Sequence, residues 1–334
     1  MRTPRLTAFQ RGQQFLIPLG ACQIVPVLVQ VPVALLGAVL WTYHHTRSQR
    51  ERIEAAFGYY LPAHEVRRFA EQHVDAGLSG ELQYGTCLLT DVERYASVSE
   101  RLDPHALREL LNRYYAVLLE VVGRHGGLVT DFAGDSLVAV WGGPKPEAER
   151  TAAACACALD IVAAVNDFNR SRGVQLPTAV GLDTGLVLLG NVGAGSRYQY
   201  RAVGDIVTTS SRLQGLNRLL GTRVLASAQT VRASGGTVAS RELGRFLLRG
   251  RTEALVVHEL LDGSRSQDEG LLQQFAEALA AVARDDLGTA RKLFGTLASR
   301  YPDDAPTRFY AALCDGRGTA GAMVRAGVVL VETK

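Results

Sequence analysis

The chain has 334 residues, of which 47% are hydrophobic, and a formal net charge of +3. This length allows a sizeable core and more than one domain, whereas the small charge and the absence of basic runs interleaved with aromatic residues exclude nucleic acid as the expected partner. The five cysteines are scattered and odd in number, so we interpret them as small core residues of a reducing compartment.

The first predicted element is a membrane span. Residues 15–41 carry no charged side chain and are numerous enough to cross a bilayer as a helix. Trp41 and Tyr43 would lie at the membrane interface, and three arginines follow them, as on a cytoplasmic flank. A cleaved signal peptide and a buried core helix are the alternatives, but no small-residue cleavage site follows. We expect residues 1–45 to hold one transmembrane segment of the inner or plasma membrane, with the rest of the chain in the cytoplasm.

Residues 46–81 are predicted to connect the membrane to the first globular domain. They begin as a charged, helix-favouring segment, are interrupted by Pro62, and end in a polar linker that contains glycine. The helix at residues 46–57 is a candidate dimer clamp.

Residues 82–262 alternate between strand and helix patterns. One helix has clear limits, because Asp103 can cap it, Pro104 suits its first turn, and Gly126 and Gly127 can end it. The stretch from Thr178 reads as two strands around a turn at residues 184–185. The pattern indicates an α+β domain whose sheet is mainly antiparallel, with its helices on one face. We expect strands within 85–91, 128–142, 178–192 and 246–261, and helices at 104–125, 147–169 and 204–220.

Residues 263–334 are predicted to be helical. Two apolar-periodic helices flank the sequence "RDDLG" and resemble one tetratricopeptide-type hairpin that ends at Pro302. Such hairpins are stable only when stacked, so this one must dock on something, and a protein partner is a candidate.

Two carboxylates, Asp91 and Asp135, are the first candidates for chemistry. Asp91 ends a strand, and Asp135 lies in the turn of the hairpin "LVTDFAGDSLVAVWG". In an antiparallel sheet these positions can be neighbours, and two carboxylates held there repel each other unless a cation neutralises them. Oxygen ligands suit Mg²⁺ or Mn²⁺, and two such ions can activate a hydroxyl and stabilise leaving phosphate oxygens. Singly, each aspartate could equally be a turn former or a helix cap.

Four blocks in this order resemble the class III nucleotide cyclase catalytic domain: "GTCLLTDVERYASVSERLDP", "HGGLVTDFAGDSLVAVWGGP", "AVGLDTGLVLLGNVGAGSRYQYRAVGDIVTTSSRLQGLN" and "FLLRGRTEAL". The resemblance covers roughly residues 82–262. It implies a ferredoxin-like α+β fold and the conversion of ATP or GTP to a 3′,5′-cyclic nucleotide and pyrophosphate, with two Mg²⁺ or Mn²⁺ ions per site. The segment "AAFGYYLPAHEVRRF" is similar to the juncture of membrane-anchored bacterial sensor cyclases, which implies a role in intracellular signalling.

Several family roles fall on matching residues. The resemblance assigns metal binding to Asp91, to Asp135 and to the backbone from Val92 onward. It implies that Arg212 stabilises the charge on the transferring phosphate. It places Arg249 at the triphosphate tail, where the family usually has lysine, so the charge is kept but not the shape.

Four positions depart from the family pattern. Asp131 stands in place of the base-reading lysine of adenylate cyclases, and Arg201 in place of its threonine or aspartate partner. Thr208 replaces the asparagine that orients the ribose, and Arg94 replaces a small residue that lets the loop approach the phosphates.

The reversed charges at residues 131 and 201 suit guanine. A carboxylate can accept from the N1 and N2 donors of guanine, and a guanidinium can donate to its O6. The base rate of the family favours ATP, so both nucleotides stay open. The alternative is a catalytically silent domain, in which Asp131 and Arg201 form a salt bridge across an unused purine pocket. The resemblance also implies a homodimer, in which Asp91 and Asp135 come from one copy and residues 201, 208 and 212 come from the other.

Overall fold

A computed structural model describes residues 80–194, 197–263, 268–316 and 321–331. The chain divides into two compact units, residues 1–73 and 74–334. The first unit lies outside the described residues, and with it the predicted membrane span and most of the predicted connector.

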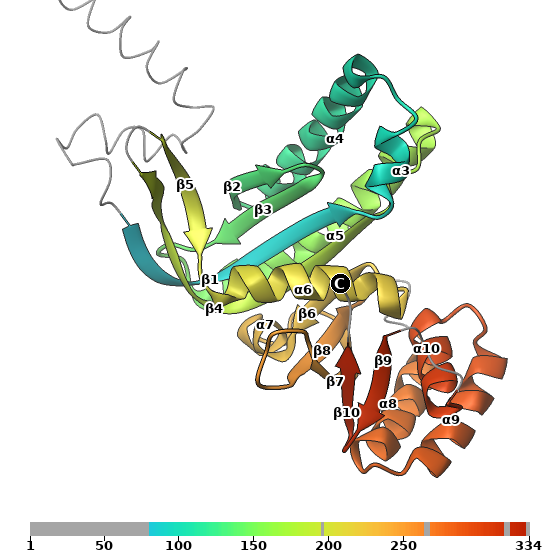
Figure 1. The fold of residues 1–334 in the computed structure, drawn as a ribbon. Helices are drawn as coiled ribbons and strands as arrows, with labels where there is room; N and C mark the ends of the chain where they lie inside the picture. The colour runs from blue at the N-terminus through green and yellow to red at the C-terminus, as the bar shows by residue number, and fades with distance from the viewer. Residues whose placement is uncertain (1–79, 195–196, 264–267, 317–320, 332–334) are drawn as a thin grey trace, which may run out of the picture. The chain divides into compact units, whose positions relative to one another are not determined.

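The strands of the second unit form one mixed sheet, shown in Figure 1. Its ten strands run in the order β2-β3-β1-β4-β6-β8-β7-β10-β9, and β5 pairs with β4 beside this path. The strands are β1 (Gly80–Val92), β2 (Leu128–Ala133), β3 (Ser136–Trp141), β4 (Thr178–Ala194), β5 (Arg197–Val203), β6 (Val224–Ser227), β7 (Ser240–Leu247), β8 (Leu255–Leu260), β9 (Ala322–Arg325) and β10 (Val328–Val331).

The helices lie on both faces of the sheet. They are α3 (Tyr95–Ser99), α4 (Pro104–Arg124), α5 (Glu147–Arg172), α6 (Asp205–Leu220), α7 (Ala228–Ala233), α8 (Glu269–Ala283), α9 (Leu287–Arg300) and α10 (Ala305–Cys314). The predicted start of α4 is confirmed, because the Asp103 carboxylate accepts from the His105 and Ala106 amides and Pro104 follows it.

One core lies between α4, α5 and the sheet. Leu88, Leu118, Leu137, Ile161 and Leu182, from β1, α4, β3, α5 and β4, are fully buried in it. By length and composition α5 is the one described helix apolar enough to cross a membrane, but its buried face packs in this core. Burial also raises the pKa values of the Cys87, Cys155 and Cys157 thiols to about 12, which agrees with their interpretation as core residues.

The expectation that all helices cover one face is wrong for α6. Val180 and Leu182 of β4 face the core with α5, whereas Gly181 between them faces α6. A Cβ atom on Gly181 would lie 2.1 Å from the Ser210 carbonyl oxygen of α6. Glycine at this position therefore lets α6 pack directly against the face of the sheet opposite to α5.

The predicted turn at residues 184–185 is also wrong, because β4 is one continuous strand. It pairs antiparallel with β1 from Thr178 opposite Val92 to Gly190 opposite Gly80. Gly185 does not have a positive φ, and it lies opposite Gly85 in the middle of this ladder. Pairing with the long strand β1 thus keeps residues 184–185 extended. Strand β1 itself begins at Gly80, five residues before the predicted start at Gly85.

The C-terminal segment belongs to the same compact unit and extends the sheet. The predicted hairpin is present as α8 and α9, but α10 and the strands β9 and β10 were not predicted. Strand β10 pairs in parallel with β7. Phe275, Phe294 and Tyr310 pack together between the three helices. The rings of Phe294 and Tyr310 stack with centroids 4.9 Å apart, and Phe275 meets both of them edge to face. The helices therefore dock on the sheet of their own chain.

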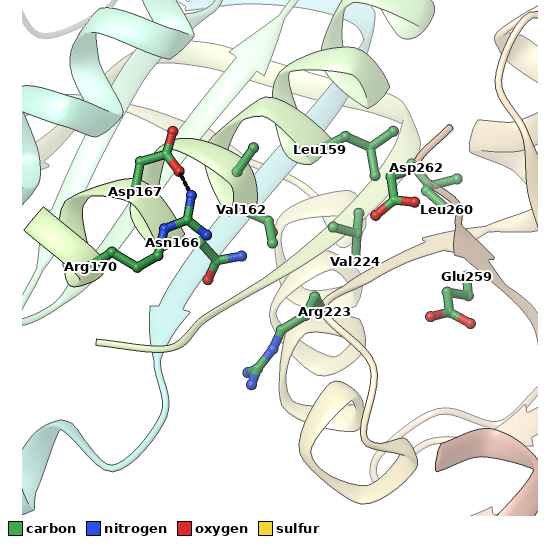
Figure 2. A pocket seen from close by; sticks show the side chains of 11 residues that line it. Leu159, Val162, Asn166, Asp167, Arg170, Arg223, Val224, Glu259, Leu260 and Asp262 are labelled. Carbon is green, nitrogen blue, oxygen red and sulfur yellow. Dashed lines mark hydrogen bonds and ion pairs between the residues drawn. The ribbon is translucent and has the colours of Figure 1, made fainter. Parts of the chain in front are cut away.

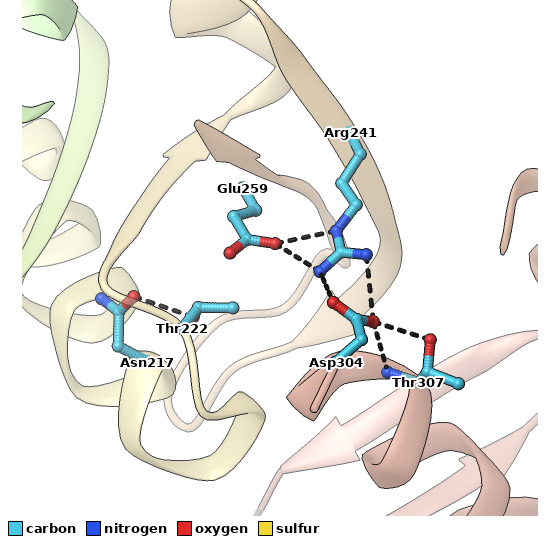
Figure 3. A network of polar contacts seen from close by, with 6 residues as sticks. All are labelled: Asn217, Thr222, Arg241, Glu259, Asp304 and Thr307. Atoms are coloured by element: carbon cyan, nitrogen blue, oxygen red, sulfur yellow. Dashed lines mark hydrogen bonds and ion pairs between the residues drawn. The ribbon is translucent and has the colours of Figure 1, made fainter. Parts of the chain in front are cut away.

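A buried ionic network fixes this docking (Figure 3). Arg241 of β7 donates to Glu259 of β8 at 2.8 Å and to both carboxylate oxygens of Asp304 at 2.7 and 3.1 Å. Asp304 also caps α10 by accepting from the Thr307 amide and hydroxyl. Burial alone would raise the pKa of Asp304, but the hydrogen bonds and charge of Arg241 hold it below its usual value.

Candidate active site

The structure brings Asp91 and Asp135 together at one end of β1. Asp91 is the penultimate residue of β1, and Asp135 lies in the two-residue turn between Ala133 of β2 and Ser136 of β3. Because β1 pairs with β3 up to the level of this turn, the turn lies beside the strand end. The Val92 amide donates to Asp135 Oδ2 at 3.0 Å, and the Ser136 hydroxyl donates to Asp91 Oδ1 at 2.6 Å.

The two carboxylates repel each other in this arrangement. Partial burial and the negative charge of Asp91 raise the pKa of Asp135 to about 6, although the Val92 amide acts in the opposite direction. Tyr95 and Tyr115 lie close enough to feel the charge of Asp135. Burial, and then this charge, raise the phenol pKa of both residues, and that of Tyr115 rises to about 12. A bound cation would remove this repulsion.

The donor atoms fit a hard divalent cation. The described residues contain no group of three or more His, Cys, Asp or Glu side chains that could hold a metal alone. Two carboxylates suit Mg²⁺ or Mn²⁺, which take one or two carboxylates and complete their shells with water and phosphate oxygens. The Val92 side chain is buried and its amide is engaged by Asp135, so its carbonyl is the atom left to act as a ligand.

Asp131 and Arg201 form an ion pair within the chain. A β-bulge between Val129 and Asp131 places Asp131 opposite Val138. Val138 lies outside the core that contains its neighbours in β3, so Asp131 points to the face that carries α6. The ion pair joins this bulged part of β2 to Arg201 of β5.

Thr208 and Arg212 lie one turn apart on α6, with Thr208 exposed and Arg212 half-buried. The turn after β7 abuts Arg212, because a Cβ atom on Gly250 would lie 3.1 Å from Arg212 Nη2. Arg249, which precedes Gly250, is exposed. The structure thus places the two predicted phosphate-binding arginines, Arg212 and Arg249, near each other.

The predicted residues fall into three groups in one chain. The first is Asp91 and Asp135 with Val92, and the second is the ion pair of Asp131 and Arg201. The third is Thr208 and Arg212 of α6 with Arg249. Among the described residues, no hydrogen bond or ion pair joins Asp91 or Asp135 to Thr208, Arg212 or Arg249.

Three residues of the site were not predicted. Ser136 holds Asp91, and its only signal was its place directly after Asp135. Arg251 binds Asp205 at 2.8 Å and Thr209 at 2.5 Å, and so fixes the turn of Arg249 on α6. Tyr115 donates to the Gly134 carbonyl in the hairpin turn, and its place within α4 gave no local signal.

Arg94 has a left-handed backbone conformation, with φ of 62° and ψ of 28°. This conformation favours glycine, which gives a physical reason for the small residue expected at this position. The arginine side chain is exposed, three residues after Asp91.

The cavity drawn in Figure 2 lies elsewhere in the unit. It has a volume of about 390 Å³ and is lined by residues of α5, including Val162 and Arg170, and by residues of β6 and β8. None of the candidate site residues lines it, so it is not part of the site described above.

Comparisons with known proteins point to one family. A sequence model of the adenylate and guanylate cyclase catalytic domain matches residues 81–260. Adenylate cyclase 1 of Rhizobium meliloti (strain 1021) is 35% identical over 209 residues, which cover 61% of this chain and 31% of that protein. The chain thus spans about a third of the length of the curated relatives it matches.

Solved structures share the fold. The adenylyl cyclase CyaB from P. aeruginosa superposes with a TM-score of 0.51 at 23% identity, covering 57% of this chain and 99% of that one. A bacterial light-regulated adenylyl cyclase gives a TM-score of 0.55 at 22% identity and covers 70% of this chain and 68% of its own.

Proposed function

The chain belongs to the class III adenylate and guanylate cyclase family, and we propose that it converts a purine nucleoside triphosphate to a 3′,5′-cyclic nucleotide and pyrophosphate. In this reaction the ribose 3′-oxygen bonds to the α-phosphorus and gives its proton to water, while the bond from that phosphorus to the leaving pyrophosphate breaks. The observation that carries the proposal is the hydrogen bond from the Val92 amide to Asp135, which holds Asp135 beside the end of β1 that carries Asp91, inside the matched domain.

The residues of the chain have distinct roles in the proposed reaction. Asp91, Asp135 and the Val92 carbonyl hold two Mg²⁺ or Mn²⁺ ions. When bound, these ions neutralise phosphate charge and favour the ionised 3′-hydroxyl. Arg212 stabilises the charge that develops on the transferring phosphate, and Arg249 binds the triphosphate tail. The Thr208 hydroxyl orients the ribose.

The proposed enzyme is a homodimer that shares its sites between two copies. Two observations support this: the acid pair and the α6 residues are not joined within one chain, and the sheet exposes an apolar patch. Leu82 of β1 lies opposite Leu188 of β4, which lies opposite Val203 of β5. These three side chains are 65%, 37% and 47% exposed. Paired residues share a face, so they form one continuous surface for a second copy.

We propose guanine as the preferred base. Asp131 stands where adenylate cyclases place a donor, and Arg201 where they place an acceptor. The ion pair keeps the carboxylate and the guanidinium side by side. The N1 donor and the O6 acceptor of guanine are likewise neighbours on the base. The Rhizobium relative is named an adenylate cyclase, so ATP is the competing substrate.

The proposal extends to the membrane. We propose that the uncharged residues 15–41 anchor the chain in the inner or plasma membrane, with the cyclase domain in the cytoplasm. The full chain should then stay with membranes during alkaline carbonate washing, and a chain that starts near Arg50 should not. Release of the full chain by the wash would exclude the anchor.

Turnover by the purified chain tests the proposed activity. With Mn²⁺ and GTP or ATP, the chain should form cyclic nucleotide and pyrophosphate in equal amounts. Asp135→Ala should lower kcat/KM by at least about 100-fold, because one metal ligand is removed. A variant that keeps the rate of the parent would show that the two aspartates only support the turn.

A catalytically silent scaffold is the second candidate, because Asp131 and Arg201 already satisfy each other in the ion pair. A silent chain would dimerise normally and form no product from either nucleotide.

A further inference from the structure

We infer that Tyr115 is a positioning residue, whose hydroxyl selects the one conformation of the hairpin turn that presents Asp135 to Asp91. The inference rests on the proposed function, since it concerns how that metal site is built. Tyr115 lies on α4 and reaches the turn between β2 and β3 from outside the hairpin.

Two contacts fix the Tyr115 side chain. Its hydroxyl donates a hydrogen bond to the carbonyl oxygen of Gly134. Its ring meets the Phe132 ring edge to face, with centroids 4.8 Å apart and planes at 76°. Phe132 belongs to β2, so the ring is anchored on the same hairpin whose turn receives the hydrogen bond.

The Gly134 carbonyl is the group that distinguishes the two common two-residue turns. Type I′ turns have a positive φ at both central residues, whereas type II′ turns have it at the first only. The two types differ by a rotation of the peptide plane between the central residues, which is the plane of the Gly134 carbonyl and the Asp135 amide. Gly134 has a φ of 64°, and Asp135 is not among the residues with positive φ, as in type II′.

Tyr115 therefore acts on Asp135 through this peptide plane. A donor on the Gly134 carbonyl holds the plane in one orientation, and this sets φ of Asp135 and the direction of its side chain. In that direction Asp135 Oδ2 accepts from the Val92 amide at 3.0 Å. Without the donor, the turn can exchange between its two forms, and the carboxylate no longer has one position beside Asp91.

The adjacent residue provides a matched control. Tyr114 is fully buried, and its hydroxyl is hydrogen-bonded to Thr178 Oγ1 of β4 at 2.9 Å and not to the hairpin turn. Tyr115→Phe and Tyr114→Phe each remove one hydroxyl and keep the ring. Only the first removes a contact to the turn.

The test compares both variants in the full chain, first without metal. Hydrogen exchange of residues 128–137 should be faster in Tyr115→Phe than in the parent and unchanged in Tyr114→Phe. The Mn²⁺ concentration that gives half of the maximal thermal stabilisation should then rise about tenfold in Tyr115→Phe, as for other residues that orient metal ligands. The half-activating Mn²⁺ concentration in turnover should rise by the same factor, with kcat at saturating metal close to that of the parent.

Equal exchange and equal Mn²⁺ midpoints in the two variants would overturn the inference. A parent that neither binds Mn²⁺ nor turns over would instead contradict the proposed function. In that case the exchange measured without metal still decides whether Tyr115 holds the turn.

Discussion

At the scale of single residues, we propose that Asp131 and Arg201 select the base that the site accepts. Their side chains are 22% and 43% exposed, so a bound purine would remove much of their remaining contact with water. A polar reader that is buried without a partner is costly, and sites built this way can discriminate by about 10⁴-fold. The pair should therefore not be neutral between GTP and ATP.

Exchanging the two readers should change the base preference. The parent with Mn²⁺ should form cyclic GMP faster than cyclic AMP at equal substrate concentrations. Asp131→Lys combined with Arg201→Thr should move this ratio toward cyclic AMP, because donor and acceptor then suit adenine. Each single substitution should be worse than the pair, since it leaves one mismatched reader. Cyclic AMP without cyclic GMP from the parent would show that these residues do not read the base as proposed.

Asp183 links stability to pH. It is 7% exposed, and burial raises its pKa to about 6, although the Ser227 hydroxyl donates to it at 2.5 Å. Between its ordinary value of 3.8 and about 6, the folded chain keeps a proton that the unfolded chain has lost. The free energy of unfolding therefore falls as the pH rises through this window, by about 3 kcal/mol from this group.

Asp183→Asn should remove this part of the pH dependence. Urea unfolding between pH 4 and 7 should show a smaller loss of stability for the variant than for the parent. Asp135 titrates in the same window, but it is present in both proteins and cancels in the comparison. Asp167→Asn, at a side chain that is 70% exposed, is the control and should leave the profile unchanged. Parallel curves for parent and Asp183→Asn would contradict the prediction.

At the scale of elements, local signals predicted the helices better than the strand pairing. The limits of α4 follow from residues at or next to its own ends: a capping aspartate and a proline at its start, and two glycines after it. The continuity of β4 depends on β1, almost a hundred residues away, because the Thr-Gly pair alone is typical of a turn. The parallel pairing of β10 with β7 likewise cannot be predicted from the spacing of hydrophobic residues. The same holds for the candidate site. Asp91 and Asp135 were predicted from their positions at a strand end and in a turn, whereas Tyr115 and Arg251 contact the site from other elements and gave no local signal.

The network of Arg241 joins α10 to β7 and β8, and its loss should be costly. In Asp304→Ala, a guanidinium that is 4% exposed loses its bidentate partner, and removal of one member of a buried pair costs about 3–5 kcal/mol. Glu109→Ala is the control, because it breaks a pair with Arg113 whose side chains are 63% and 48% exposed. That substitution should cost no more than about 0.5 kcal/mol. Equal urea midpoints for the two variants would mean that the C-terminal helices dock without this network.

At the scale of the whole molecule, two regions of the sheet differ in what covers them. The end formed by β7, β10 and β9 is covered by the chain's own helices α8 to α10, as Figure 1 shows. The region around β1, β4 and β5 carries the exposed apolar row of Leu82, Leu188 and Val203. A cyclase that takes its acid pair from one copy and its α6 residues from another needs a second chain, and this row is where we place it.

Complementation between two inactive variants tests whether the active site is shared between two copies of the chain. Asp135→Ala and Arg212→Ala should each form cyclic nucleotide at no more than about a hundredth of the parent rate alone, because each homodimer lacks one component at both sites. Mixed in equal amounts and allowed to exchange, they should recover about a quarter of the parent rate, since half of the dimers are mixed and each of these has one intact site of two. An active parent whose two variants stay inactive after mixing, with exchange shown by differently tagged chains, would contradict the shared site. A parent that forms no cyclic nucleotide from GTP or ATP would contradict the proposed activity itself.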